Sequence, residues 1–98
     1  MDKEAMDKIE KRIKTLEDNQ LKIAREFGKQ GVYFYLTLAG MKIASLGEEK
    51  YKAYESFMRD SMDQAGQQMA KARSVAKVIE LSDKFIDDCI KYTTEQFK

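Results

Sequence analysis

Apolar residues recur at alternating steps of three and four along the first 27 residues of the chain. The series is Met6, Ile9, Ile13, Leu16, Ile23 and Phe27, with the polar Gln20 completing the spacing. Steps of three and four put side chains on one face of an α-helix, and their alternation gives the heptad spacing of a coiled coil. The pattern therefore predicts an amphipathic helix over residues 3–27.

Two glycines, Gly28 and Gly31, follow this segment and suggest a helix end and a turn. Residues 32–46 come next and are the least polar stretch. Their β-branched and aromatic opening, residues 32–38, suits a strand as well as a buried helix. No second segment offers a strand to pair with, and two-stranded sheets are marginally stable. We therefore expect a buried central helix over residues 32–46.

The second half of the chain contains no proline and, after Gly47, only one further glycine, Gly66. Gly47 is followed by two glutamates, which are favourable in the first turn of a helix. A single helix from here to the C-terminus would be roughly 75 Å long and would lack a partner of equal length in the chain. We instead expect two helices, residues 48–73 and 75–97, with a bend near Gly66 or Ser74.

These elements predict one all-α domain, residues 1–98, built as a small three- to four-helix bundle or helical hairpin. We expect it to be oligomeric through coiled-coil-like packing. If the first stripe forms a parallel homodimer, Arg12 and Glu17 take attractive flanking positions, and Gln20 can specify the register. Alternatively, the same stripe packs inside the chain against a later helix.

A second apolar seam follows residues 58–79 and is rich in methionine and alanine. Alanine allows helices to approach closely, and methionine fills irregular gaps or lines adaptable binding grooves. Core packing and partner binding both remain open for this seam and for the nearby aromatic side chains. The residues that we consider for a partner or self-association interface are Ile9, Ile13, Leu16, Ile23, Phe27, Tyr51, Tyr54, Met58, Met62 and Met69.

Composition argues against several functional classes. The 98 residues carry 18 Lys and Arg against 17 Asp and Glu, a net charge of +1, so nucleic-acid binding is not expected. There is no histidine and only one cysteine, Cys89, so no His or Cys pairing can build a metal site or a nucleophile–base pair. Cys89 neighbours Ile90 on an apolar face, as a buried, inert thiol would. We expect no enzymatic activity, no cofactor and no metal.

The compartment is inferred from the same composition. A single cysteine suits a reducing environment, and the densely charged N-terminus resembles neither a secretory signal nor an apolar anchor. The longest uncharged run around the central segment, residues 30–41, is 12 residues against the roughly 20 needed for a transmembrane helix. We therefore expect a cytoplasmic protein without a transmembrane segment.

The function that fits best is a small non-enzymatic interaction module that acts by occupying the surface of a protein partner. It would serve as an inhibitor, an adaptor or an assembly subunit, and a bacterial or phage origin suits such a chain. A different class is suggested by residues 72–81 and 83–85, which resemble the C-terminal part of phasins. That resemblance implies an amphipathic helical coat protein that binds an apolar interface such as a polyester storage granule.

Overall fold

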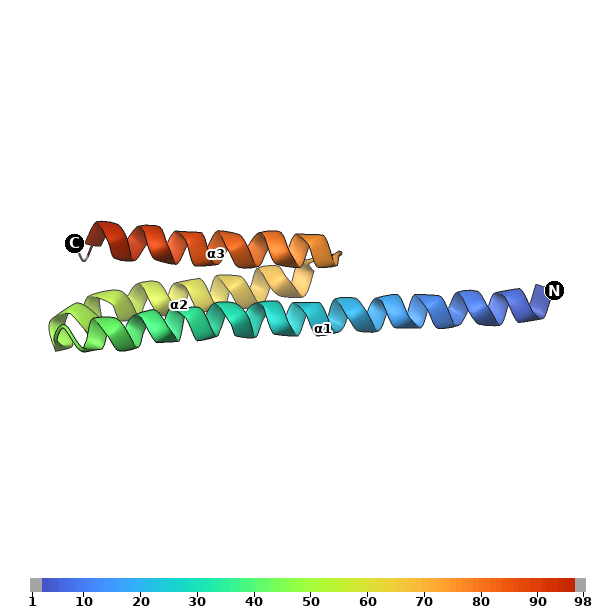
Figure 1. The fold of residues 1–98 in the computed structure, drawn as a ribbon, viewed down its shortest axis with the longest axis horizontal. Helices are drawn as coiled ribbons and strands as arrows, with labels where there is room; N and C mark the ends of the chain where they lie inside the picture. Colours follow the sequence, from blue (N-terminus) through green and yellow to red (C-terminus); the bar gives the residue numbers. More distant parts are fainter. Residues whose placement is uncertain (1–2, 97–98) are drawn as a thin grey trace.

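The computed structural model describes residues 3–96, and throughout this range the chain forms three α-helices and no strand. The helices are α1 (Lys3–Ala44), α2 (Glu48–Lys71) and α3 (Val75–Gln96). α2 runs back along α1, and α3 returns beside both, so that α1 projects far beyond the other two (Figure 1). The described chain measures 68 × 17 × 17 Å. The prediction of an all-α fold is confirmed.

The turn expected at Gly28 and Gly31 was wrong, because α1 continues through both glycines to Ala44. The helices predicted over residues 3–27 and 32–46 are therefore one element, and the helical alternative for the apolar opening of residues 32–38 is correct. Gly28 serves close packing instead of a turn: a Cβ atom there would lie 2.6 Å from Cγ1 of Val78 on α3. Burial around Gly28 outweighs the roughly 1 kcal/mol that a glycine costs inside a helix.

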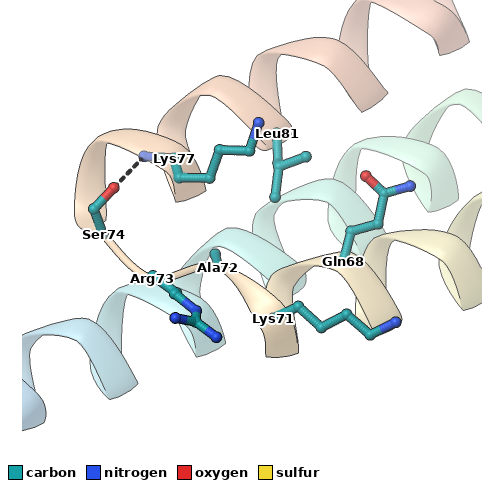
Figure 2. A pocket seen from close by; sticks show the side chains of 7 residues that line it. All are labelled: Gln68, Lys71, Ala72, Arg73, Ser74, Lys77 and Leu81. Atoms are coloured by element: carbon teal, nitrogen blue, oxygen red, sulfur yellow. Dashed lines mark hydrogen bonds between the residues drawn. The ribbon is translucent and has the colours of Figure 1, made fainter.

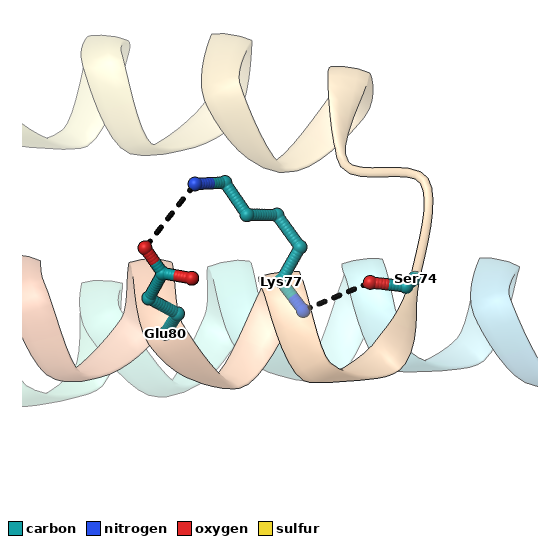
Figure 3. Close-up of polar contacts among 3 residues, drawn as sticks. All are labelled: Ser74, Lys77 and Glu80. Atoms are coloured by element: carbon teal, nitrogen blue, oxygen red, sulfur yellow. Dashed lines mark hydrogen bonds and ion pairs between the residues drawn. The ribbon is translucent and has the colours of Figure 1, made fainter.

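The two real breaks lie at Gly47 and near Ser74. Gly47 has φ = 125°, a conformation that side chains disfavour, and it connects α1 to α2. Ser74 precedes α3, and its Oγ accepts a hydrogen bond from the backbone N–H of Lys77 at 3.1 Å (Figure 3). The bend predicted near Ser74 is confirmed, whereas Gly66 lies inside α2. Phe97, the last residue of the predicted final helix, lies outside the described residues.

The core lies where all three helices run side by side. It contains Val32, Leu36 and Ile43 of α1, Tyr54, Ala65, Met69 and Ala72 at and beside α2, and Val78, Leu81, Phe85 and Cys89 of α3. Tyr54 is fully buried, and its hydroxyl donates a 2.7 Å hydrogen bond to the Leu36 carbonyl. Nearby, the rings of Phe57 and Tyr92 stack with centroids 4.0 Å apart and thereby join α2 to α3.

The end of α2 is attached to a specific point on α1. The guanidinium of Arg25 donates two hydrogen bonds to the Ala72 carbonyl, one of them from Nε at 2.7 Å. This carbonyl is one of the groups that a helix leaves without an internal partner at its C-terminus. One turn earlier on α1, Leu21 packs against the core cluster. The bundle therefore covers α1 from about Leu21 to its end.

Candidate interaction surface

The N-terminal part of α1 has no helix beside it within the described chain. We call residues 3–20 the extension, and at 1.5 Å per residue it is about 27 Å long. Every residue of the extension is exposed except Ala5, which is half-buried. Figure 1 shows it projecting alone beyond the turn between α2 and α3.

The bundle ends near Leu21 because the inner face of α1, which is apolar within the bundle, becomes charged in the extension. The side that carries Leu21 and Val32 within the bundle carries Asp7, Lys14 and Asp18 in the extension, as the helical repeat of about 3.6 residues per turn requires. Charged side chains cannot replace the apolar ones in a core without large desolvation costs. The change from apolar to charged residues on this face therefore sets the point at which α2 and α3 no longer cover α1.

Large apolar side chains nevertheless continue on the outer side of α1 along nearly its whole length. The set that follows the heptad spacing is Met6, Ile9, Ile13, Leu16, Ile23, Phe27, Phe34 and Met41. Their exposed fractions range from 44% for Ile9 to 71% for Phe27. We call these eight residues the α1 stripe. The same spacing places the polar and exposed residues Gln20, Gln30 and Thr37 on this line.

The α1 stripe lies opposite the face that packs in the bundle. Val32 and Leu36 are 1% exposed, whereas Phe34 between them is 67% exposed. Two residues along an α-helix correspond to a rotation of about 200°, so these side chains point in nearly opposite directions. α1 is therefore apolar on two sides, one filled by α2 and α3 and the other uncovered. The possibility that the stripe packs against a later helix of the same chain is excluded in this fold.

Sequence reasoning found six of the eight stripe residues and missed Phe34 and Met41. It missed them because the helix was expected to end after Phe27. The signal was present in the sequence, since Phe27, Phe34 and Met41 are each seven residues apart, with no change of register across Gly28 and Gly31.

The other five interface candidates belong to α2 and have a different environment. Tyr54 and Met69 are 0% and 1% exposed and form part of the core. Tyr51, Met58 and Met62 are half-buried and pack against that core. The methionine and alanine seam of α2 thus faces the interior of the chain, and it does not join the α1 stripe in one surface.

A groove of about 700 Å³ opens near the C-terminal end of α1. It is lined by Leu38, Met41 and neighbouring residues of α1 and by Thr93 of α3. Because Met41 belongs to the stripe, the groove extends the apolar surface toward α3. The outer surface of α1 therefore ends beside a groove that α1 and α3 share.

A second pocket, of about 510 Å³, lies at the turn between α2 and α3. Lys71, Arg73 and Lys77 line it, but their charged ends diverge and do not meet at one point (Figure 2). The Lys77 ammonium is already 3.3 Å from a carboxylate oxygen of Glu80 (Figure 3). This arrangement does not form a convergent anion site.

The single cysteine, Cys89, is buried in the core. Burial raises the pKa of the Cys89 thiol, which lies 3.6 Å from the Tyr54 hydroxyl, and a protonated buried thiol is a poor nucleophile. Within residues 3–96, no three His, Cys, Asp or Glu side chains gather closely enough to bind a metal ion. Over the same range, every helix is too short or too polar to span a bilayer.

Comparison with known proteins adds no family to this description. No protein-family model, no curated protein and no solved structure matches the chain. The resemblance of residues 72–81 and 83–85 to phasins is therefore not supported by a family match.

Proposed function

We propose that this chain is a small, non-enzymatic protein–protein interaction module that works through the α1 stripe. The single observation that supports the proposal is an apolar face that runs the length of α1 and that no other part of the described chain covers. Helices in proteins gain most of their stability from packing an amphipathic face, and the apolar face of the extension packs against nothing within its own chain. The module thus acts by laying α1 along a surface of its partner.

The charge pattern favours a protein surface over a lipid or granule surface. Residues 3–20 carry five basic and five acidic side chains, so the extension has no net charge. Helices that lie in a membrane interface are typically rich in Lys and Arg on their polar face. A balanced face can instead form paired contacts with a protein, where charges determine specificity more than affinity.

Site-specific photo-cross-linking in the cells that produce the protein tests this proposal. A photoreactive residue at Leu16, on the stripe, is expected to give a protein adduct, whereas the same residue at Asp18, on the charged side, gives little. The adduct from position 16 is expected to disappear when Ile13→Asp interrupts the stripe next to it. Equal adducts from positions 16 and 18, or no protein adduct from either, would contradict the proposal.

The coat-protein alternative is supported by the same exposed stripe, because an interfacial helix also presents one apolar side. It predicts that the protein partitions onto phosphatidylcholine vesicles or hydrocarbon droplets and gains helicity there. An interaction module is expected to stay in the aqueous phase with an unchanged circular dichroism spectrum. Stripe-dependent partitioning would replace the proposed function by the coat-protein function.

A further inference from the structure

We propose that the partner that covers the α1 stripe is a second copy of this chain, aligned parallel and in register, so that two α1 helices form one coiled coil. This inference rests on the proposed function, because it names the occupant of the same surface. In this arrangement each bundle of α2 and α3 lies on the outside, since the stripe and the bundle are on opposite sides of α1. Both chains keep their own core unchanged.

The heptad spacing assigns each stripe residue to a central position of such a coiled coil. Met6, Ile13, Gln20, Phe27, Phe34 and Met41 take one central position, and Ile9, Leu16, Ile23, Gln30 and Thr37 take the other. In register, every layer pairs a residue with its own copy. The polar residues Gln20, Gln30 and Thr37 therefore meet polar partners and never face an apolar layer.

The flanking charges are complementary in this register. Arg12 faces Glu17 of the second copy, and by symmetry the contact occurs twice. The other flanking pairs are Ala5 with Glu10, Asn19 with Ala24, Glu26 with Gly31 and Tyr33 with Leu38, so no like charges oppose each other. Arg12 and Glu17 are both exposed and free to reach across.

The antiparallel arrangement that overlaps the whole stripe is less favourable. In that arrangement Ile9 lies opposite Met41 of the second copy, and Ile13 lies opposite its Thr37. The Glu26 side chains of the two copies then lie beside each other, so two like charges meet. Arg12 then faces Gly40 and Tyr33 of the second copy, and its contact with Glu17 is lost. The charge pattern consequently selects the parallel arrangement.

The exposed apolar area of the stripe is of the order that a dimer interface needs. The eight stripe side chains are 44% to 71% exposed. Only the two phenylalanines have the full area of about 150–250 Å² that aromatic side chains bury, so the stripe offers less than the roughly 800 Å² that one partner contributes to a standard-size interface, but an amount of the same order. A single chain that leaves the α1 stripe in water would be prone to aggregation. The second copy removes the stripe from solvent.

Charge reversal at the flanking pair tests both the occupant and the orientation. The dimer dissociation constant of the full chain is measured by sedimentation equilibrium for the original protein, for Arg12→Glu, for Glu17→Arg and for the double variant. Each single reversal is expected to raise the dimer dissociation constant about tenfold, because it places like charges opposite each other. The double variant restores opposite charges and is expected to recover most of the lost affinity. Lys11→Glu makes the same change of charge one residue away, outside the flanking positions, and is expected to leave the dissociation constant within about twofold.

The outcomes separate this inference from the proposed function. A dimer without recovery in the double variant would overturn the parallel register. A chain that stays monomeric at several hundred micromolar would overturn the second copy as occupant. If that monomer still gave a Leu16-specific adduct with another protein, the proposed function would stand and only the present inference would fall.

Discussion

At the scale of single residues, glycine has two different roles in α1. Gly28 is a contact point, because a Cβ atom there would meet Val78 on α3, whereas Gly31 has no atom within 4 Å of its would-be Cβ. Sequence alone cannot separate these roles, since both residues look like helix breakers. The distinction depends on which side of α1 faces α3.

Gly28→Ala and Gly31→Ala are therefore expected to have opposite effects on stability. At Gly28 the new methyl group would lie 2.6 Å from the stiff, branched Val78 side chain, and such overpacking costs about 1–3 kcal/mol. At Gly31 the substitution should add about 0.5–1 kcal/mol through better helix propensity. Urea denaturation of both variants measures the difference. A stabilising Gly28→Ala would show that α1 and α3 do not pack this closely.

The buried Tyr54 hydroxyl, which donates a hydrogen bond to the Leu36 carbonyl, makes the stability of the fold depend on pH. Burial, and secondarily the Cys89 thiol, raises the pKa of the Tyr54 hydroxyl far above its ordinary value. The folded chain then holds this proton more tightly than the unfolded chain does. Its contribution to stability is complete below about pH 10, the unfolded value, and is lost as the pH rises beyond it.

Tyr54→Phe is expected to cost about 0.5–1.5 kcal/mol at neutral pH and to make the alkaline loss of stability less steep. Cys89, whose pKa is also raised, accounts for the remaining loss above about pH 8.5. Unfolding free energies between pH 7 and 11 test this, with Tyr51→Phe as the control that leaves the Leu36 hydrogen bond intact. Equal slopes for the two variants would contradict the account.

At the scale of elements, the sequence predicted the helices well and their boundaries unevenly. The break at Gly47 was identified because a glycine followed by two glutamates marks the start of a new helix. The second bend was predicted near either Gly66 or Ser74, within the apolar seam of residues 58–79, and the structure places it next to Ser74. The supposed break at Gly28 was wrong because the apolar pattern on both sides of α1 continues through it. A glycine pair interrupts a helix only when tertiary packing does not compensate, and here Val78 and Met69 pack directly against Gly28.

The candidate surface was predicted in part for a related reason. The heptad series to Phe27 is visible in the sequence, whereas the burial of Tyr54 and Met69 depends on how α2 folds back on α1. One-dimensional periodicity shows that a helix has an apolar side. It does not show whether that side faces the chain's own core or the solvent.

Ile13→Asp is expected to affect assembly through the extension without affecting the stability of the bundle at the other end of α1. A carboxylate in the middle of the α1 stripe should abolish assembly, because burying an unpaired charge is costly. Ile13 lies in the extension, so the unfolding free energy of the monomeric bundle should change by less than about 0.5 kcal/mol. Sedimentation and urea denaturation provide the two readouts.

Two further variants complete this comparison. Thr15→Asp adds the same charge two residues away, off the stripe, and should preserve assembly. Leu36→Ala should instead cost about 2–5 kcal/mol of bundle stability, because it opens a cavity in the core. If Ile13→Asp destabilised the bundle as Leu36→Ala does, the extension would have to pack within its own chain.

At the scale of the whole molecule, the chain combines a short bundle with a long single helix. The bundle gives each chain a core, and it orients α1 by covering one side of it from Leu21 onward. The uncovered side carries exposed apolar side chains from Met6 to Met41, with the polar residues Gln20, Gln30 and Thr37 between them. This division explains how a chain of 98 residues can bury a core and still leave one face of α1 exposed for the partner that we propose.

The most direct measurement is the absolute mass in solution across a hundredfold dilution, by light scattering after size exclusion. The account predicts twice the 11.4 kDa chain mass at high concentration, with dissociation toward a folded monomer on dilution. It also predicts that Ile13→Asp has the monomer mass throughout. A mass of 11.4 kDa for the unaltered chain at every concentration would contradict the claim that a second copy covers the α1 stripe.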